Sequence, residues 1–572
     1  MLKATNRLKL LVPSLPLSTM AQAKNVLIVG GVAGGMSAAT RLRRLDETAK
    51  ITVLEKGPYI SYANCGIPYN LGGVIEKESA LHLQTVPKIK AWFNVDVHVN
   101  TELLRIDRGN NTATVRDNKT GIESTLPYDK LILAMGAEAF VPPIKGVHSK
   151  HVFHLQTIPD LQQIEAFIVS NNVRRAAVLG GGFIGLEAAE NLRKRGLEVS
   201  LFEYGPHVFP LVDGDIAERL DTGLVRNGID LALNARVLEI TDSSIVAEGR
   251  DPTPVDLVIV AVGIRARSAI AKEAGLAVGQ KGVTVNESMQ TSDPDIYAVG
   301  DMVETQHLVT GTAVQTALAG PANRQGRLAA DHIAGRAVQY RGNVGTAVCQ
   351  VFDQTVGLVG LSTDNLKRAG IEHEYVTVHP PQHASWYPGG TPMTMKVAFE
   401  VSSGKILGAQ IVGGEGVDKR IDVLATAMRG GLTIEDLEHL ELGYAPPYGA
   451  AKDAINMVGF VGGNVLRGDV KIVHAAEFAD GSLNLKDYQV VDVRSPEEFA
   501  RGHVKGAVNI PIGGLRERMA ELSQDKKILT YCYVGYRGYL AYRVLVQNGF
   551  DVVNLDGGFK AVSEGGYKSL QA

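Results

Sequence analysis

The sequence predicts an α/β protein with two Rossmann-like β-α-β units, followed by an antiparallel α+β region and a small α/β module. Two glycine-rich turns, at residues 30–35 and 180–185, each follow an apolar run of strand length and precede a helical pattern. The alternation of strands and helices is lost after about residue 340, where strands are expected at 348–352, 356–359, 395–399 and 406–412 and helices at about 416–430 and 434–440. It returns after about residue 470, with strands expected at 490–493 and 527–531 and a helix at 540–548. A length of 572 residues fits roughly three to five domains.

The composition argues against two classes of protein. The chain has 58 Lys and Arg against 61 Asp and Glu, so it lacks the basic excess that is typical of a nucleic-acid binder. No run of about 18 consecutive apolar residues occurs, and we therefore expect no membrane span. The three cysteines (Cys65, Cys349 and Cys532) are too few for a disulfide framework, which favours a reducing compartment such as the cytoplasm.

Residues 1–23 differ from the rest of the chain. They contain Lys3, Arg7 and Lys9 together with serines and threonines, and they contain no acid. This composition is typical of a mitochondrial transit peptide ending near Met20, which would place the protein in the matrix. A disordered leader, or a start codon upstream of the true one, explains the same residues equally well.

The second β-α-β unit carries the complete G-x-G-x-x-G fingerprint, in Gly180, Gly182 and Gly185. These glycines make the turn, admit a pyrophosphate and pack the helix on the strand. The strands and the helix are expected at 176–179, 199–203 and 186–195. At the end of the second strand, Glu203 can accept hydrogen bonds from a ribose 2′-OH and repel a 2′-phosphate, which favours NADH over NADPH. The alternative is a glycine-rich packing turn.

The first unit matches the fingerprint less completely, because Val32 occupies the position of the middle glycine between Gly30 and Gly35. Its strands are expected at 26–30 and 51–55, and its helix at about 36–45. Glu55 ends the second strand, as Glu203 does in the other unit. A purely structural turn is the alternative here.

Three later segments support the nucleotide-binding interpretation. Leu131–Gly136 and Val258–Gly263 are apolar strands that end in small residues, and 291–301 is a strand that ends in Gly300-Asp301 before a long helical region. An acid at such a strand end can bind the hydroxyl groups of a ribityl chain.

The order of these motifs resembles the two-dinucleotide-binding flavoproteins, the pyridine nucleotide–disulfide oxidoreductase family. One departure is Ile264-Arg265-Ala266-Arg267, where relatives often have Arg-Pro-Asn. The resemblance implies that the first unit binds FAD, with Glu55 on the ribose and Asp301 on the ribityl group. The residues implied to contact FAD are Gly30, Val32, Ala33, Gly34, Gly35, Glu55, Lys56, Ala134, Gly136, Gly300 and Asp301. It implies NADH, or NADPH, on the second unit, at Gly180, Gly182, Phe183, Ile184, Gly185, Glu203 and Gly263.

Cys65 has no second cysteine in a Cys-x-x-Cys or Cys-x4-Cys pattern. It can therefore form a mixed disulfide with a small thiol, a sulfenic acid or a persulfide, but no internal disulfide with a near neighbour. Its thiolate would need a lowered pKa, which a flavin and a nearby helix N-terminus can provide. Alone, a buried structural cysteine would be the alternative. Cys349 lies in an apolar strand and is expected in the core.

The segment Ala63–Tyr69 (ANCGIPY) resembles the coenzyme A disulfide reductase subfamily, which includes NADH-dependent persulfide and polysulfide reductases. Residues 383–389 (HASWYPG) and 444–453 (YAPPYGAAKD) match it as well, and the resemblance covers about 24–465. It implies that Cys65 is the redox centre and that the protein is a homodimer, in which Tyr387 and Tyr444 of one subunit act at the Cys65 of the other.

Four further residues are candidates for binding the substrate. Ser61 and Asn64 flank Cys65 and are expected to position the thiol substrate or its pyrophosphate. Arg43 and Arg44 can meet the anionic end of coenzyme A, although a solvated helix face explains such a pair as well.

The C-terminal module has the pattern Cys532-x-x-Gly535-x-Arg537 between a buried strand and a helix. Backbone N–H groups of such a loop can stabilise a thiolate and later a persulfide, and the helix dipole acts in the same direction. Together with DVRSPEEF at 492–499 and NLDGGF at 554–559, the loop resembles a single rhodanese domain. Cys532 and Arg537 are its candidate catalytic residues, and an inactive interaction domain is the alternative.

The sequence thus predicts a leader (1–23), an FAD-binding domain in two parts (24–150 and 271–338), an NAD(H)-binding domain (151–270), a dimerisation domain (339–465) and a rhodanese domain (470–572). The expected activity is NAD(P)H-dependent reduction, through FAD and Cys65, of coenzyme A disulfide, coenzyme A persulfide or polysulfide, with sulfurtransfer at Cys532. No metal is expected. The alternatives are an NADH oxidase or peroxidase acting through a Cys65 sulfenic acid, and a redox-sensing sulfur carrier.

Overall fold

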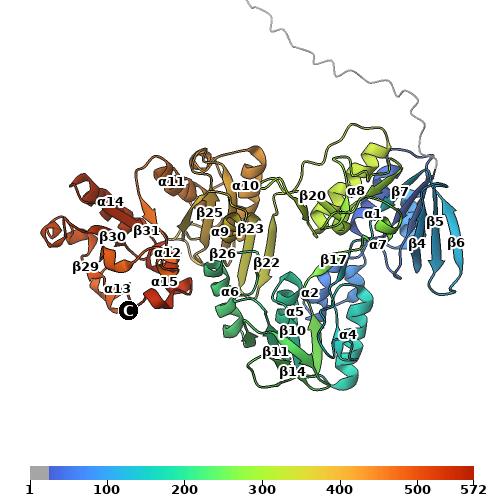
Figure 1. Cartoon of the computed structure of the whole chain (residues 1–572), viewed down its shortest axis with the longest axis horizontal. Coiled ribbons are helices and arrows are strands. Elements are labelled where there is room, and N and C mark those ends of the chain that lie inside the picture. The colour runs from blue at the N-terminus through green and yellow to red at the C-terminus, as the bar shows by residue number, and fades with distance from the viewer. Residues whose placement is uncertain (1–24) are drawn as a thin grey trace, which may run out of the picture.

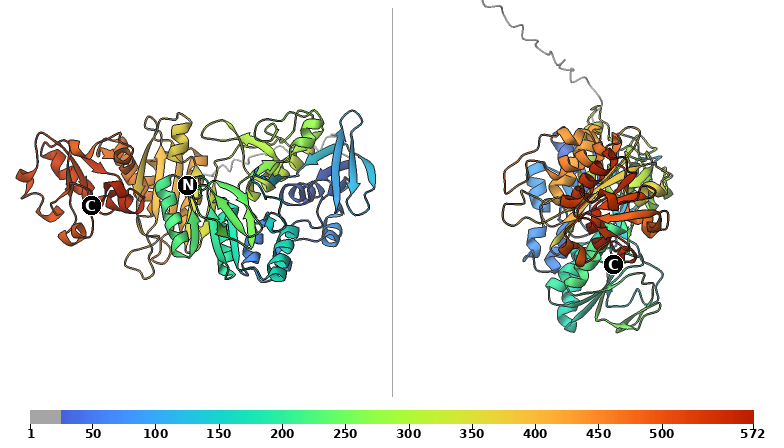
Figure 2. Two further views of the ribbon diagram at one scale, coloured as in Figure 1. Left: turned by 60° about the horizontal axis from the view of Figure 1, so that its bottom comes forward. Right: turned by 90° about the vertical axis from the view of Figure 1, so that its left-hand side faces the viewer.

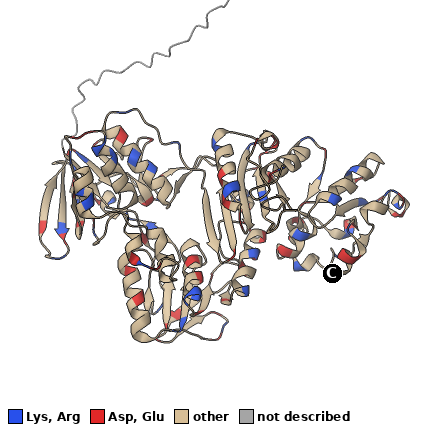
Figure 3. Ribbon diagram, turned by 180° about the vertical axis from the view of Figure 1, so that it is seen from behind, with Lys and Arg blue, Asp and Glu red and all other residues tan. Residues whose placement is uncertain are grey.

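The computed structural model describes residues 25–572, so the predicted leader lies outside the described residues. Four α/β or α+β units follow the long axis of the molecule (Figure 1). The first unit and the C-terminal unit lie at opposite ends, and the second unit and the antiparallel unit lie between them. This arrangement confirms the predicted fold class. In the described chain no helix is both long and apolar enough to cross a membrane. Acidic and basic residues are interspersed along the ribbon (Figure 3).

The first unit contains a parallel sheet in the order β19-β7-β1-β2-β3. Its strands are β1 (Asn25–Val29), β2 (Lys50–Leu54), β3 (Asp96–His98), β7 (Lys130–Leu133) and β19 (Ile296–Ala298). Helix α1 (Ala33–Arg43) packs against α8 (Ala319–Ile333) so closely that a Cβ on Gly326 would overlap the carbonyl oxygen of Gly34. The helical region expected directly after residue 301 begins only at 319, because the hairpin β20 (Val303–Gln306) and β21 (Ala313–Gln315) intervenes.

The second unit is inserted between the two parts of the first. Its parallel sheet has the order β12-β11-β10-β16-β9. The strands are β9 (Val152–Phe153), β10 (Arg175–Leu179), β11 (Glu198–Phe202), β12 (Ile229–Ala232) and β16 (Leu257–Val260). Helix α5 (Phe183–Lys194) begins three residues before the predicted start, directly after Gly182, and α6 (Gly214–Arg226) leads towards the antiparallel unit.

The antiparallel unit is a five-stranded sheet covered by helices. The strands are β22 (Ala347–Val351), β23 (Gln354–Gly360), β24 (Glu374–Val378), β25 (Thr394–Phe399) and β26 (Ile406–Gly413). Helix α10 (Val417–Gly430) agrees with the prediction, whereas the helix expected at 434–440 is a single 3-10 turn, Asp436–His439. The edge strand β24 was not predicted. Strands β23 to β26 share one apolar core with the helices α10 and α11 (Ala454–Leu466).

The C-terminal unit is a separate parallel sheet in the order β27-β31-β30-β28-β29. The strands are β27 (Ile472–Val473), β28 (Tyr488–Asp492), β29 (Val508–Asn509), β30 (Lys527–Tyr531) and β31 (Val552–Leu555). Helix α14 (Tyr536–Gln547) begins four residues before the predicted start, because the positive φ of Gly535 (+97°) turns the chain directly into it. Seen along the long axis, this unit faces the viewer in front of the others (Figure 2).

A buried lysine joins the second unit to the antiparallel unit. Lys396 on β25 lies 2.9 Å from a carboxylate oxygen of Asp213 and 3.1 Å from one of Asp215, at the start of α6. Burial alone would raise the pKa of Asp213, but the charge of Lys396 and hydrogen bonds from Asp364 and Thr363 lower it. Removal of one partner from such a buried pair typically costs about 3–5 kcal/mol. The orientation of α6 is therefore fixed by the antiparallel sheet.

His474 joins the C-terminal unit to the antiparallel unit. Its Nε2 lies 2.8 Å from Glu374, its Nδ1 lies 3.4 Å from Asp556, and its ring stacks on Tyr375 at 3.7 Å between centroids. Burial would lower the pKa of His474, but the neighbouring carboxylates of Asp556 and Glu374 outweigh this effect and raise the pKa to about 9. The imidazolium is thus a charged link between the two units.

This link predicts a pH-dependent stability. Because the folded-state pKa of His474 is about 9 and the unfolded value is about 6.5, its contribution is complete below about pH 6.5 and is lost as the pH rises through 9. At pH 6 the melting temperature of His474→Gln should be lower than that of the wild type. The difference between the two melting temperatures should be smaller at pH 9.5. Calorimetry at the two pH values measures these melting temperatures. An equal difference between variant and wild type at both pH values would contradict the prediction.

Candidate active sites

A cavity of about 630 Å³ lies at the carboxyl ends of the strands of the first unit. It contains most of the residues predicted for FAD: Gly30, Val32, Ala33, Gly34, Glu55, Lys56, Ala134, Gly136, Gly300 and Asp301. Gly35 is predicted as well but does not line it. The volume is within the usual range for cofactor sites, and its position at these strand ends is typical of a dinucleotide.

The two glycine turns have the same backbone geometry. Gly30 and Gly180 have φ values of +112° and +99°, and a side chain at either would overlap the backbone of the neighbouring strand end. A Cβ on Gly35 or Gly185 would overlap the carbonyl oxygen of the first glycine. These positions therefore require glycine.

The middle position does not have this requirement. Val32 has φ −111° and Gly182 has φ −80°, both accessible to any residue, and both are N-cap residues of their helices. This explains why the first unit tolerates a valine. A Cβ on Gly182 would meet nothing within 4 Å, so space remains above the N-terminus of α5, where Phe183 and Ile184 begin the helix. Gly263 has φ +117°, and a Cβ there would likewise meet nothing within 4 Å.

Glu55 and Glu203 make the same pair of contacts. One oxygen of Glu55 accepts hydrogen bonds from the N–H of Gly31 at 2.8 Å, and the other accepts one from Gly57 at 2.8 Å. Glu203 does the same with Gly181 and Gly205, both at 2.7 Å. Each carboxylate is therefore held beside its glycine turn, where a ribose would reach it. This agreement between the two units is the local signature of a dinucleotide site.

Asp301 also lines the cavity, three residues after the end of β19. Burial alone raises the pKa of its carboxyl group. The preceding residue, Gly300, has φ +80° and donates its N–H to Gln325 at 2.7 Å, which fixes the turn. A partly buried acid that lines a cavity is a polar group that a ligand hydroxyl could satisfy.

Cys65 lies in a 3-10 turn, Asn64–Gly66, directly before α2 (Ile67–Leu71), and it is exposed. Asn64 lines the cavity, and its side-chain oxygen accepts a hydrogen bond from the Cys65 N–H at 3.1 Å. In the protein alone the pKa of Cys65 is raised, first by burial and then by the charges of Glu187 and Asp301. The expected lowering of this pKa is therefore not a property of the chain itself, and α2 is only five residues long.

Two neighbours of Cys65 were missed by the sequence analysis. Glu187 on α5 accepts a hydrogen bond from the Tyr69 hydroxyl at 3.1 Å, and burial raises the pKa of Glu187. These side chains join α2 of the first unit to α5 of the second. Nothing in the local sequence pattern indicates this contact, because 118 residues separate its partners. Cys349 lies in β22, where burial raises its pKa, as expected of a core thiol.

The candidate substrate residues lie in different surroundings. Ser61 has φ +43°, and its backbone bonds to Gly31 and Leu83 hold the chain beside Cys65. Arg43 is buried, and its guanidinium donates to the carbonyl oxygens of five residues, namely Phe93, Asp46, Glu47, Ala49 and Asn94. All five of its N–H groups are therefore used, so the prediction that Arg43 binds substrate is corrected to a structural role. Arg44 is exposed.

Tyr387 and Tyr444 lie in loops of the antiparallel unit, and both are partly exposed. Trp386 and Tyr448, which lie close to them in sequence, are 70% and 74% exposed. Within the described chain no hydrogen bond joins either tyrosine to Cys65. The single chain therefore does not assemble this part of the predicted site.

In the C-terminal unit, Cys532 is completely buried at the end of β30, with Gly535 beginning the turn into α14. Arg537 and Glu498 form a bidentate ion pair, at 2.8 and 2.7 Å. This pair raises the pKa of Arg537 and lowers that of Glu498 to about 2. The Cys532 thiol also lies close enough to Arg537 to contribute to the raised pKa of the guanidinium. Glu498 lies in the segment 492–499 that resembles a rhodanese domain, but the sequence pattern alone indicates no role for it.

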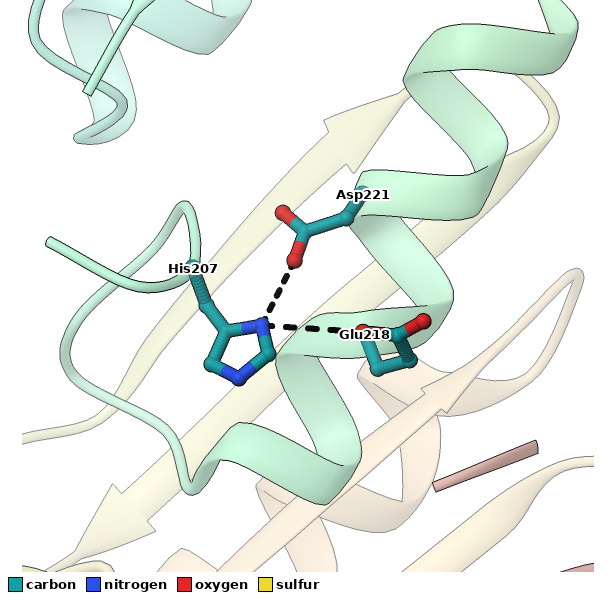
Figure 4. Close-up of side chains that lie close together, drawn as sticks. All are labelled: His207, Glu218 and Asp221. Carbon is teal, nitrogen blue, oxygen red and sulfur yellow. Dashed lines mark hydrogen bonds and ion pairs between the residues drawn. The ribbon is translucent and has the colours of Figure 1, made fainter. Parts of the chain in front are cut away.

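One further cluster has the residue types of a metal site. His207 lies 2.7 Å from Asp221 and 3.8 Å from Glu218, both on α6 (Figure 4). The same ring nitrogen, Nδ1, makes both contacts, and the hydrogen bond with Asp221 raises the pKa of His207. The arrangement is that of an ion pair which fixes the loop before α6.

Comparisons with known proteins agree with this geometry. Residues 24–326 match the pyridine nucleotide-disulphide oxidoreductase family, 346–454 match its dimerisation domain, and 475–564 match the rhodanese-like domain. The coenzyme A disulfide reductase of Staphylococcus aureus (strain bovine RF122 / ET3-1) is 34% identical over 437 residues, which are 76% of this chain and 99% of the relative.

Solved structures extend the likeness over all four units. The reduced CoADR-RHD of Bacillus anthracis has a TM-score of 0.94 and 42% identity, and it covers 96% of this chain and 99% of its own. The NAD-dependent persulfide reductase of A. fulgidus has a TM-score of 0.88 and 36% identity, and the match covers 94% of this chain and 99% of the reductase. Family membership implies FAD and a pyridine nucleotide. The chain therefore belongs to the pyridine nucleotide-disulphide oxidoreductase family and carries a C-terminal rhodanese domain.

Proposed function

We propose that the protein is an FAD-dependent reductase of coenzyme A disulfide, coenzyme A persulfide or polysulfide, which prefers NADH and transfers sulfane sulfur at Cys532. The observation that carries this proposal is an exposed Cys65 that directly follows Asn64, a residue that lines the dinucleotide cavity. The other two cysteines of the chain are buried, so none is exposed to serve as a resolving thiol. The relatives and the attached rhodanese domain favour sulfur chemistry over the oxidase and sensor alternatives.

The residues of the chain support a simple division of labour. Glu55 and Asp301 would hold the ribose and ribityl hydroxyls of FAD, and Glu203 would hold the ribose of NADH. The Cys65 thiolate would attack one sulfur of coenzyme A disulfide, breaking the S–S bond, forming a mixed disulfide and releasing one thiolate; with a persulfide it would attack the outer sulfur and become a persulfide itself, again releasing a thiolate. When bound, FAD and NADH supply the two electrons that return Cys65 to the thiolate. Asn64 would keep the sulfur oriented through the backbone N–H of Cys65.

A mobile thiol would connect the two sulfur centres. Cys65 precedes α2, near the middle of the molecule, whereas Cys532 follows β30 in the unit at the far end (Figure 1). Direct transfer between them within one chain would require a large movement. We therefore expect Cys532 to hold a sulfane sulfur as a persulfide and pass it to an acceptor thiol, which carries it to Cys65.

The antiparallel unit would form a homodimer. Its family match is to a dimerisation domain, and it exposes Trp386, Tyr387, Tyr444 and Tyr448. Large exposed aromatic side chains are typical of protein interfaces. In the dimer, Tyr387 and Tyr444 would approach the partner's Cys65 and donate a proton to the departing thiolate.

Replacement of the redox cysteine should abolish reduction. Cys65→Ser removes the nucleophile but lies outside the residues expected to hold FAD, so the variant should bind flavin and show no NADH-dependent turnover of disulfides or persulfides. Cys349→Ser, which changes a buried thiol of the reductase part, should retain turnover. Absorbance of the flavin and anaerobic NADH consumption measure the two properties, and an active Cys65→Ser would refute the mechanism.

Replacement of the second cysteine should separate the two activities. Cys532→Ser should stop the transfer of sulfur from thiosulfate to cyanide, because the persulfide carrier is lost, while NADH-dependent reduction of simple disulfides continues at the wild-type rate. Parallel assays on one preparation test this, and undiminished sulfurtransfer would eliminate Cys532 as the carrier.

Glu203 should determine the choice of nicotinamide cofactor. Loss of charged hydrogen bonds to the ribose in Glu203→Ala should reduce the preference for NADH over NADPH by about tenfold to a hundredfold. Glu203→Gln keeps the length of the side chain and one carbonyl oxygen, which can accept the bond from Gly181 or the bond from Gly205, but it does not repel a 2′-phosphate. It is therefore the milder control for a damaged loop. The ratio of the two kcat/KM values is the measurement, and an unchanged ratio in both variants would assign the selectivity to another residue.

A further inference from the structure

A turn of two glycines lies between the reductase part and the loop that holds Cys532. Gly557 and Gly558 have φ values of +66° and +61°, so the chain bends through two consecutive left-handed residues between β31 and α15 (Gly558–Glu564). Such a turn is favourable only for glycine. It brings the chain backbone into direct contact with neighbours on both sides.

On one side the turn contacts the antiparallel sheet. His379, directly after β24, has its Nε2 at 3.1 Å from the carbonyl oxygen of Gly557. Thr377 donates its backbone N–H to Asp556 at 3.0 Å. A Cβ on Gly557 would lie 2.8 Å from the Cβ of Ala561 in its own domain and 3.2 Å from both the His379 Nε2 and the Thr377 Cβ, so the two domains are in close contact here.

On the other side the turn contacts the Cys532 loop. A Cβ on Gly558 would lie 2.5 Å from the carbonyl oxygen of Cys532 and 2.8 Å from the N–H nitrogen of Gly535. Two backbone N–H groups that follow the turn, those of Phe559 and Lys560, donate to the carbonyl oxygens of Cys532 and Tyr533, both at 2.8 Å. The position of the Cys532 backbone is therefore set by the position of the glycine turn.

Helix α6 supports the same region from the NAD(H)-binding side. Arg219 is 9% exposed, and its Nε lies 3.5 Å from Glu564, which accepts a hydrogen bond from the Tyr533 hydroxyl through its other oxygen at 3.4 Å. A Cβ on Gly565 would lie 3.2 Å from the Cβ of Asp215. Two domains of the reductase thus close around the last helix of the rhodanese domain.

We propose that the dimerisation domain is a structural part of the sulfurtransferase site, with His379 as the residue that positions the Cys532 loop through Gly557. The inference rests on the proposed sulfurtransferase function of Cys532 and adds that this function depends on docking to the reductase. His379 suits the task because its Nδ1 lies 3.0 Å from the Thr394 hydroxyl, which leaves Nε2–H to donate to Gly557. The sequence resemblance to a free-standing rhodanese domain does not indicate this dependence.

The test uses the full-length protein with three variants. His379→Ala removes the donor to Gly557, His379→Gln keeps an amide donor at the position of Nε2, and His439→Ala changes an exposed histidine of the same domain. Three properties are measured: the kcat of thiosulfate sulfurtransfer, the NADH-dependent disulfide reduction, and the pH profile of iodoacetamide alkylation at Cys532 by mass spectrometry. The last of these needs neither cofactor nor turnover.

In His379→Ala we expect the sulfurtransfer kcat to fall about tenfold and the alkylation profile to shift, with reduction unchanged. His379→Gln should restore most of the sulfurtransfer kcat and most of the wild-type alkylation profile. His439→Ala should have the same values of all three properties as the wild type. Should His379→Ala fail to fold, Thr394→Val, which removes the hydroxyl that orients the ring, takes its place with the same expected direction.

Wild-type sulfurtransfer and alkylation in His379→Ala would overturn the inference while leaving the proposed function intact. A wild-type protein without any sulfurtransfer would instead refute the function of Cys532. In that case an unchanged alkylation profile in His379→Ala would refute the positioning role, and a shifted one would support it.

Discussion

The contact of backbone on backbone at the two glycine turns is the constraint on which the reductase part depends. Gly35 lies against Gly30, and Gly185 lies against Gly180, with no room for a Cβ. Only this approach directs each helix N-terminus at the space beside its strand ends, and it places Glu55 and Glu203 where each can bridge two backbone amides. The cavity of the first unit and the open N-terminus of α5 follow from it.

The sequence predicted those parts of the molecule that are fixed by local geometry. The glycine turns, the acids at the strand ends and the loop of Cys532 each depend on residues within about thirty positions of one another, so their spacing carries the information. The same locality explains the accurate bounds of β30 and α10. The structure adds that Val32 is acceptable because the middle position has an ordinary φ.

The sequence could not predict contacts between distant segments. Lys396 and Asp213, Tyr69 and Glu187, and His474 and Glu374 are each separated by 100 residues or more, and nothing in their surroundings marks them as partners. Arg43 shows the opposite error, because an arginine beside another arginine suggested an anion site while the fold surrounds its guanidinium with carbonyl oxygens. The edge strand β24 was missed for a related reason. Its role becomes evident only when the C-terminal domain lies against its end.

The division of the first sheet has a consequence for how the chain is made. Strand β19 pairs with β7, aligning Ile296 with Leu131, and the residues after it complete the cavity wall. A ribosome releases the N-terminal part first, so the whole second domain emerges before this edge strand does. Flavin can therefore be enclosed only late in synthesis, and until then the nascent first sheet presents an unpaired edge that the cell must protect from aggregation.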